Sequence, residues 1–297
     1  MTVLEVIQRS TEFLAQKGVE SPRRNIEEML AQVLRLPRLQ LYLNFARALS
    51  DAETDALRAM VKRRAQREPL QHILGTASFC GREILVSRAA LVPRPETELL
   101  AERAGKFLAS LEGASVTALD FGTGSGCLAV ALAAEAPRAI IHALDRSAEA
   151  LALARRNVAA HDLTERVVFF AGDGFAALSA GMAYDVIVSN PPYIPTAEIA
   201  TLEPEVRDFD PRAALDGGAD GLDFYRRLAG EAAAWLKAGG KVMVEFGDGQ
   251  AEALREIFSD KKWIVEAVEE DYSHRPRILM ARVGAPAAGE AGGADRG

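Results

Sequence analysis

From residue 115 onward, short apolar segments alternate with amphipathic ones, and this alternation constrains the fold more than any other feature. Segments of strand length cover residues 116–121, 139–145, 166–171, 184–189, 240–246, 262–269 and 276–283. Apolar strands that alternate with helices are typical of a largely parallel sheet covered on both faces. The last two strands have only a short connection, so we expect them to pair antiparallel. The sequence therefore predicts an α/β fold.

Before the sheet, the chain has the pattern of a small helical domain followed by a hairpin. Apolar residues recur at helical spacing, and Ser50–Glu53 is a capping box that opens a further helix. Apolar residues also flank Cys80-Gly81-Arg82, which predicts a short hairpin. We divide the chain into a helical domain at 1–70, a hairpin linker at 71–94, an α/β domain at 95–283 and a disordered Ala/Gly-rich tail at 284–297.

The balance of charge argues against a protein held mainly by nucleic-acid phosphates, because the net charge is −7. Residues 1–74 carry 12 basic and 9 acidic side chains, a net of +3, so the remaining residues carry −10. We interpret this asymmetry as two parts with different tasks. The basic cluster of Arg63, Arg64 and Arg67 is too small for a duplex footprint, and we interpret it as an exposed helix face.

Cysteine and histidine content gives no reason to expect a metal site or a disulfide framework. The two cysteines, Cys80 and Cys127, form no CxxC pair, and the four histidines have no ligand spacing. No apolar run approaches about 18 residues, and the N-terminus lacks the apolar core of a signal peptide. We therefore expect a cytoplasmic protein with no bound metal and no membrane segment.

The first strand of the expected sheet ends in a glycine-rich loop, Gly122-Thr123-Gly124-Ser125-Gly126, which leads into a helix. Glycines let the backbone turn sharply and approach a ligand, and the helix start offers unpaired N–H groups. A dinucleotide fingerprint would need glycine at Cys127, and a P-loop would need Gly-Lys-Ser/Thr, so both are excluded. GxGxG after a strand is the usual form of an S-adenosylmethionine site, although a tight turn alone stays an alternative.

The next two strands end in acidic residues that fit the same ligand. Asp145 lies 19 residues after Gly126, where a carboxylate can accept hydrogen bonds from two ribose hydroxyls. Asp173 is followed by Gly174 at the end of the third strand. In enzymes that bind S-adenosylmethionine, a carboxylate at this position commonly faces the adenine amino group. The alternatives are that Asp145 caps the next helix, a role for which Ser147 is better placed, and that Asp173 is an ordinary loop residue.

The sharpest motif is Asn190-Pro191-Pro192-Tyr193, which follows the fourth strand. The prolines have fixed φ angles and no N–H, and Asn190 before proline favours an extended backbone. The Asn190 side-chain oxygen and the Pro191 carbonyl can each accept one N–H of a planar –NH2 group, while Tyr193 packs on its face. This would orient the nitrogen of an amide or an adenine towards a sulfonium methyl. A plain proline-rich turn is the alternative.

Taken in order along the chain, these motifs resemble the PrmC/HemK family, the glutamine-N(5) methyltransferases of peptide chain release factors. The resemblance covers residues 1–283. It rests on Gln71–Gly75, Leu91–Glu98, Leu119–Gly126, Asn190–Ile194, Glu205–Gly218 with its continuation to Arg226, and Glu245–Gly247 with Gln250.

The resemblance implies a five-helix N-terminal domain, a hairpin linker and a Rossmann-like seven-stranded S-adenosylmethionine-dependent methyltransferase domain. It implies methyl transfer from S-adenosyl-L-methionine, which leaves as S-adenosyl-L-homocysteine, to the glutamine N5 in the Gly-Gly-Gln loop of class I release factors. The cofactor contacts would be Gly122–Gly126, Asp145, Asp173, Gly174 and Asn190, and Asn190–Tyr193 would hold the glutamine amide. We expect the helical domain to recognise the release factor.

Two segments either depart from the family pattern or allow more than one interpretation. Some relatives have a large aromatic residue over adenine at position 174, where this chain has Gly174, and Phe175 is the candidate to replace it. Residues 203–226, broken by Pro204 and Pro211, fit a lid or a substrate-facing loop, with a solvated surface loop as the alternative.

Two other functions fit parts of the sequence. Asn-Pro-Pro-Tyr serves adenine-N(6) methylation of nucleic acid equally well, but the net charge and the lack of an inserted target-reading domain argue against that substrate. A non-catalytic cofactor-binding scaffold would not need the Asn-Pro-Pro-Tyr geometry. We expect a monomer that makes no direct contact with nucleic acid.

Overall fold

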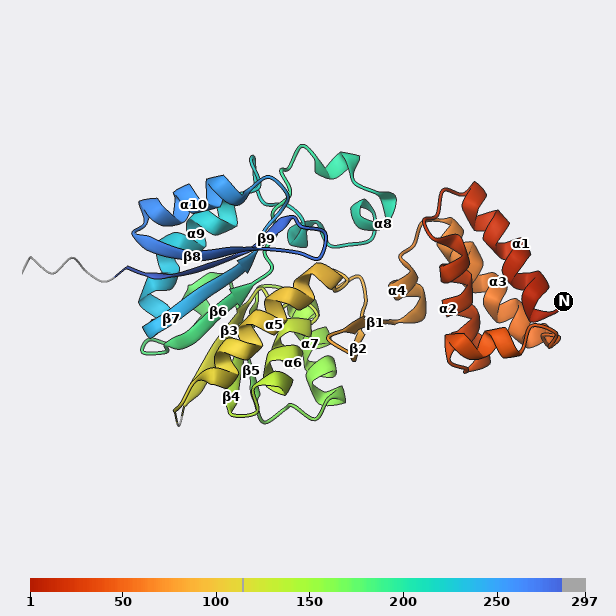
Figure 1. Ribbon diagram of the computed structural model, residues 1–297, viewed down its shortest axis with the longest axis horizontal. Helices are drawn as coiled ribbons and strands as arrows, with labels where there is room; N and C mark the ends of the chain where they lie inside the picture. The colour runs from red at the N-terminus through yellow and green to blue at the C-terminus, as the bar shows by residue number, and fades with distance from the viewer. Residues whose placement is uncertain (114, 285–297) are drawn as a thin grey trace, which may run out of the picture.

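A computed structural model of the chain describes residues 1–113 and 115–284. Figure 1 shows a helical N-terminal region at one end, a two-stranded hairpin beside it, and a larger α/β part. The predicted tail lies outside the described residues except for Gly284, whose N–H donates to the Lys262 carbonyl across 3.1 Å. No helix in the described ranges has the length and apolar character needed to cross a membrane.

The N-terminal region contains four α-helices and one 3-10 helix in residues 1–75: α1 (Val3–Gln16), α2 (Pro22–Leu34), η1 (Arg38–Leu43), α3 (Asp51–Ala65) and α4 (Leu70–Leu74). The predicted capping box at Ser50 and Glu53 is present, because each residue satisfies a backbone N–H of the other. The apolar faces form one core that includes Ile26, Leu30 and, from α4, Ile73. The N-terminal region is therefore helical as predicted, and its core includes α4, most of which falls in the predicted linker.

The hairpin consists of β1 (Thr76–Phe79) and β2 (Arg82–Leu85), paired antiparallel. Asn157 holds it to the α/β part, since the Asn157 amide exchanges hydrogen bonds of 2.7 and 3.0 Å with the Leu85 backbone. The same amide nitrogen donates to the Ser125 carbonyl across 2.8 Å. One buried amide thus joins the linker to the glycine-rich loop.

The large sheet has seven strands in the order β5-β4-β3-β6-β7-β9-β8. They are β3 (Val116–Phe121), β4 (Ala139–Asp145), β5 (Val167–Ala171), β6 (Tyr184–Ser189), β7 (Leu236–Glu245), β8 (Trp263–Glu270) and β9 (Pro276–Val283). The predicted antiparallel pairing of β8 with β9 is confirmed, and β9 also pairs antiparallel with β7. Strand β7 begins earlier than predicted because Leu236 pairs with Tyr184 before an irregularity in register.

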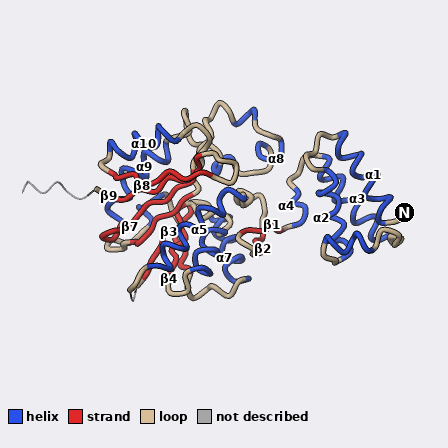
Figure 2. The backbone as a smooth tube through the Cα atoms, viewed as in Figure 1, coloured by secondary structure: helices blue, strands red, loops and turns tan. Residues whose placement is uncertain are grey.

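Helices cover both faces of this sheet (Figure 2). The helices α5 (Pro95–Ser110), α6 (Cys127–Glu135) and α7 (Ala148–Ala160) pack on one face, and α9 (Asp223–Glu231) and α10 (Ala251–Asp260) pack on the other. Neighbouring strand residues such as Ala118 and Leu119 belong to opposite cores, so the strands are buried on both sides. The predicted α/β fold is confirmed, and the carboxyl ends of its parallel strands are free to form a site.

Candidate functional site

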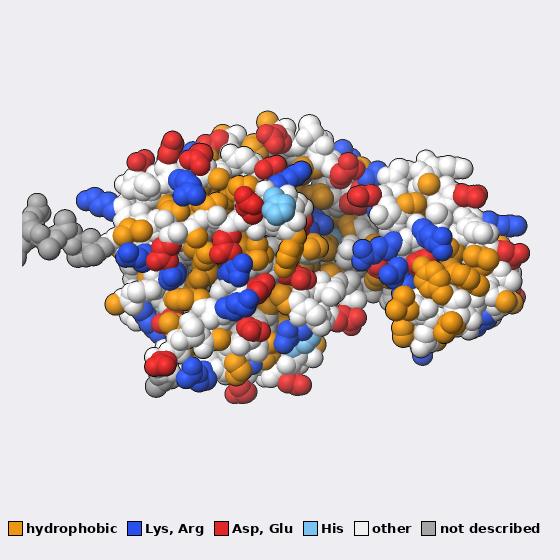
Figure 3. Space-filling view, in the orientation of Figure 1, with side chains coloured by type: hydrophobic (Ala, Val, Ile, Leu, Met, Phe, Trp, Pro, Cys, Tyr) orange, Lys and Arg blue, Asp and Glu red, His pale blue; other side chains and the backbone are white. Residues whose placement is uncertain are grey.

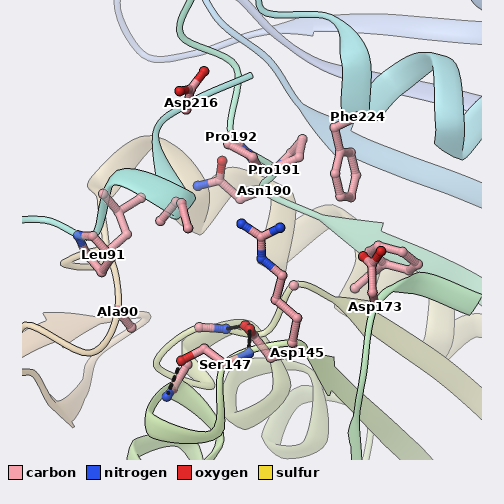
Figure 4. Close-up of a pocket in the computed structure, with 18 of the residues that line it drawn as sticks. Ala90, Leu91, Asp145, Ser147, Asp173, Asn190, Pro191, Pro192, Asp216 and Phe224 are labelled. Carbon is pink, nitrogen blue, oxygen red and sulfur yellow. Dashed lines mark hydrogen bonds between the residues drawn. The ribbon is translucent and has the colours of Figure 1, made fainter. Parts of the chain in front are cut away.

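A cavity of about 520 Å³ lies at the carboxyl ends of β3, β4, β5 and β6 (Figure 4). Most of the site residues predicted from the sequence line it: Gly122, Gly124, Asp145, Asp173, Gly174, Asn190, Pro191 and Pro192. Thr123, Ser125 and Gly126 are buried and do not line this cavity, and Tyr193 lines a second, adjoining cavity. The fold therefore brings together motifs that are up to 70 residues apart in the sequence.

The glycine-rich loop owes its shape to three positive φ angles: +80° at Gly122, +55° at Gly124 and +79° at Gly126. These are conformations that side chains disfavour. A Cβ at Gly126 would also lie 2.9 Å from the Ala154 Cβ, so α7 can pack against the loop only at a glycine.

Asp120 supports the loop from beneath, and our sequence analysis did not include it among the site residues. Its Oδ2 accepts hydrogen bonds from the Thr123 hydroxyl across 2.6 Å and from the Ala129 N–H across 3.1 Å. Burial raises the pKa of Asp120 to about 7, and its Oδ1 has no partner among the described residues. The signal in the sequence was an acidic residue near the end of an apolar strand, two positions before the first glycine.

Asp145 fixes the other side of the loop. Its Oδ2 accepts the Gly124 N–H and its Oδ1 accepts the Ser147 N–H, each across 2.9 Å (Figure 4). The helix cap belongs to Ser147, whose Oγ accepts the Ala150 N–H across 3.1 Å. Asp145 therefore does not serve as the side-chain cap of α7, and its carboxylate lies at the cavity edge.

The region around Gly174 differs from expectation. Phe175 does not line the cavity but is buried beneath it, between Phe121 and Trp235, with ring centroids 4.8 and 5.5 Å away. Phe224 from α9 points into the cavity instead (Figure 4). A Cβ at position 174 would collide with the Arg227 guanidinium, which lies 2.8 Å from the Asp173 carboxylate. Glycine at 174 thus makes room for an arginine from α9.

Asn190 lies between the two cavities. Its Nδ2 donates to the Thr97 hydroxyl of α5 across 2.9 Å, while its buried Oδ1 has no partner among the described residues. Asn190 and Pro191 line both the large cavity and a smaller one of about 280 Å³. A buried acceptor without a donor is costly, so this oxygen is suited to an N–H that a ligand brings.

The smaller cavity contains Tyr193 and several charged side chains: Arg94, Glu96, Glu245 and Arg277. Gln250 holds the backbone at Tyr193, since its Nε2 donates to the Tyr193 carbonyl and its Oε1 accepts the Gly247 N–H, both across 2.9 Å. Burial raises the pKa of Tyr193 to about 12, so its hydroxyl stays neutral. Burial also raises the pKa of Glu245 to about 7, against the lowering effect of the Thr97 hydroxyl.

Residues 195–222 close both cavities from one side. Leu202, Val206 and Leu215 line the smaller cavity, whereas Pro211 and Gly217 line the larger one. The segment returns to the Asn-Pro-Pro-Tyr motif through hydrogen bonds between Ile194 and the stretch 215–217. The contacts that attach this segment to the rest of the site join residues far apart in the sequence, such as Asp210 with Arg94. From the sequence alone only a lid or a substrate-facing loop could be predicted.

Comparison with known proteins supports these assignments of fold and family. A family model described as the PrmC N-terminal domain matches residues 5–75, and one described as the methyltransferase small domain matches residues 97–202. A methyltransferase structure from Pyrococcus furiosus superimposes with a TM-score of 0.51 at 20% identity, over 75% of this chain and 99% of that one. The fold, the glycine-rich loop and these matches define the protein as a methyltransferase with an additional N-terminal helical region.

Curated relatives narrow the class to one family. A release factor glutamine methyltransferase of Geobacter sulfurreducens is 44% identical, over 95% of this chain and 97% of the relative. One of Chlorobaculum tepidum is 42% identical, over 94% and 96%. The chain belongs to the release factor glutamine methyltransferase family, and the resemblance to the PrmC/HemK enzymes is confirmed.

Proposed function

We propose that the protein transfers a methyl group from S-adenosyl-L-methionine to the side-chain N5 of the glutamine in the Gly-Gly-Gln loop of class I release factors. The observation that carries this proposal is the position of Asn190, between two cavities and with its buried amide oxygen unpartnered in the described structure. One cavity suits a cofactor and the other suits a peptide loop. Family membership supports the choice of substrate.

The large cavity fits S-adenosylmethionine in size and in the chemistry of its donors and acceptors. Its volume of about 520 Å³ is in the usual range for small-molecule sites. Gly122 and Gly124 give close approach to the backbone, and Asp145 gives a carboxylate for ribose hydroxyls. When bound, the cofactor supplies an electrophilic methyl group on a positively charged sulfur.

We assign the adenine end of the cavity to Asp173, Gly174 and α9. Asp173 would accept the adenine amino group, as the sequence suggests. Because Phe175 is buried elsewhere, Phe224 takes the place of the missing aromatic residue at 174, and the Arg227 guanidinium adds a flat cationic surface next to it. Aromatic rings and guanidinium planes both stack on a purine face.

The substrate amide would enter from the smaller cavity. An amide nitrogen is a poor nucleophile because its lone pair is delocalised, so orientation is the main contribution the protein can make. The Asn190 Oδ1 accepts one amide N–H and the Pro191 carbonyl accepts the other. Tyr193 packs on the amide plane, and its neutral hydroxyl takes no part as a base. The amide proton becomes acidic as the methyl group arrives, so no strong base is required.

We assign recognition of the release factor to the N-terminal helical domain, residues 1–70. Hydrophobic side chains gather on this region in the view of Figure 3. Leu39 and Leu43 of η1 are 73% and 85% exposed, which is unusual for leucine, and Arg35 and Arg38 lie beside them in the sequence. We further propose that the enzyme works as a cytoplasmic monomer without direct contact with nucleic acid.

Labelling distinguishes this function from adenine-N(6) methylation of nucleic acid. The purified protein is incubated with methyl-labelled S-adenosylmethionine and either a class I release factor, DNA or RNA. We expect label in the release factor and none in its variant with alanine in place of the Gly-Gly-Gln glutamine. Label in a nucleic acid, with none in the release factor, would contradict the proposal.

A further inference from the structure

Arg64 and Arg67 do not belong to an exposed helix face, which corrects our interpretation of the sequence, whereas Arg63 is exposed as predicted. Arg64 is only 5% exposed, and its guanidinium points out of the helical region to the α/β part. Arg64 Nη2 and Arg67 Nε donate to the same Glu205 oxygen, across 2.9 and 2.6 Å. Glu205 belongs to α8 (Pro204–Arg207), which Figure 1 shows next to the N-terminal region.

The arginine end of this contact is rigidly held. Arg64 Nε donates to the Asn25 Oδ1 across 2.7 Å. The Asn25 Nδ2 in turn donates to the carbonyls of Glu20 and Ser21, across 3.1 and 3.0 Å. An unbroken series of side-chain hydrogen bonds therefore runs from the turn before α2, through α3, to Glu205.

The contact is an ion pair at neutral pH. Burial raises the pKa of Glu205, but the hydrogen bonds from Arg67 and Arg64 outweigh this effect, and the pKa is lowered overall. Arg67 also pairs with the exposed Glu203 across 2.7 Å. Because Arg64 is buried, loss of the Glu205 carboxylate leaves a desolvated cation without its partner, which favours movement of α8 away from α3.

The glutamate end of the contact lies next to a residue that lines the smaller cavity. The segment 195–222 is attached at its base through Ile194 and Asp216, and in its middle through Asp210, which is 2.8 Å from the Arg94 guanidinium. The tip is α8, where Val206, the next residue after Glu205, lines the smaller cavity. Glu205 therefore connects the helical region to the surface that would face the glutamine-bearing loop.

We infer that Glu205 is a positioning residue through which the N-terminal region, by Arg64 and Arg67, holds α8 in place as a wall of the substrate cavity. The inference extends the proposed function and rests on it for the nature of the substrate. The N-terminal region then has a second task beyond recognition, since it completes the active site of the other part. Movement of α8 should impair methyl transfer while leaving the cofactor cavity intact.

The test uses the full-length variants Glu205→Gln and Arg67→Gln, with Arg63→Gln as the matched control. Arg63 lies on α3, four residues before Arg67, but pairs with Glu68 inside the helical region, across 2.7 Å. Hydrogen–deuterium exchange at 25 °C should become at least about 10-fold faster in residues 203–210, which contain α8, in Glu205→Gln, and less so in Arg67→Gln. The control should match the wild type, and the affinity for S-adenosylhomocysteine should change less than about 2-fold in all three.

Methyl transfer to the release factor gives the second readout. We expect kcat to fall about 10-fold in Glu205→Gln while cofactor affinity is unchanged, a split that general destabilisation would not produce. Unchanged exchange in 203–210, or unchanged kcat, would overturn the inference. The exchange experiment needs no substrate, so a failure of the wild type to label release factors would count against the proposed function alone.

Discussion

The Asn190 Nδ2 donates to the hydroxyl oxygen of Thr97 across 2.9 Å, and this one bond decides which way the Asn190 amide faces. With the nitrogen fixed on Thr97, the Oδ1 is left buried and unpartnered within the described structure, at the junction of the two cavities. We expect Asn190→Ala to fold normally and to lose about 100-fold or more in kcat, because the amide substrate loses its acceptor. Activity near the wild-type level would show that this oxygen has no role.

Thr97 should affect catalysis through its hydrogen bond with Asn190. Thr97→Val keeps the volume but removes the acceptor, so the Asn190 amide can rotate and its Oδ1 is no longer held towards the substrate. We expect kcat to fall about 5-fold with little change in cofactor affinity, since the lost bond is worth about 1 kcal/mol. Thr97→Ser retains the hydroxyl and should stay close to the wild type. Equal losses in both variants would point to packing instead.

Asp145 should govern cofactor affinity. Its carboxylate accepts two backbone N–H groups at the cavity edge and would also accept ribose hydroxyls. We expect Asp145→Ala to weaken S-adenosylhomocysteine binding about 10- to 100-fold by calorimetry, because hydrogen bonds to a charged group are worth about 1.5–3 kcal/mol each. The exposed Asp260 on α10 provides the control, since Asp260→Ala should bind like the wild type.

Glu245 should make folding stability depend on pH. Its pKa is raised from 4.5 to about 7 in the folded state, so the folded protein holds a proton that the unfolded chain releases. Stability is therefore lost as pH rises from about 4.5 to 7. Glu245→Gln removes this loss. Between pH 4.5 and 8, its unfolding free energy should therefore fall by about 1–3 kcal/mol less than that of the wild type. Urea unfolding at several pH values measures it.

A surface glutamate serves as the control for that experiment. Glu252 lies on α10 with a side chain that is 87% exposed, so Glu252→Gln should leave the pH dependence of stability as it is in the wild type. Parallel curves for Glu245→Gln and the wild type would mean that Glu245 titrates as an ordinary exposed carboxylate.

The exposed leucines of η1 should affect recognition of the release factor and nothing else. We expect Leu39→Ser with Leu43→Ser to raise KM for the release factor about 10-fold, with kcat and cofactor affinity nearly unchanged. Val168 of β5 is 44% exposed on the α/β part, so Val168→Ser tests whether loss of any exposed apolar side chain has the same effect. A similar rise in KM for Val168→Ser would refute a specific role for η1.

The parts of the fold and site that local patterns encode could be predicted from the sequence. The strands, the glycine-rich loop, Asp145 and Asn-Pro-Pro-Tyr each depend on a few consecutive residues whose spacing has a direct conformational meaning. The carboxyl ends of parallel strands meet at one edge of the sheet, so the motifs that follow these strands also come together there.

The contacts that complete the site could not be predicted, because they join segments distant in the sequence. Thr97 is 93 residues from Asn190, and Glu205 is 141 residues from Arg64. Phe175 is aromatic, as a residue that covers adenine would be, but its ring packs in the core between Phe121 and Trp235. Arg64 carries a charge typical of the surface, and only a partner on a different part of the chain explains its burial.

Asn190 and Pro191 line both cavities, and this shared boundary has a consequence for the order of events. Each ligand has its own compartment, so neither needs to leave before the other arrives, and no methylated enzyme is required to carry the group between them. Reaction then proceeds in a ternary complex, with sequential rather than ping-pong kinetics.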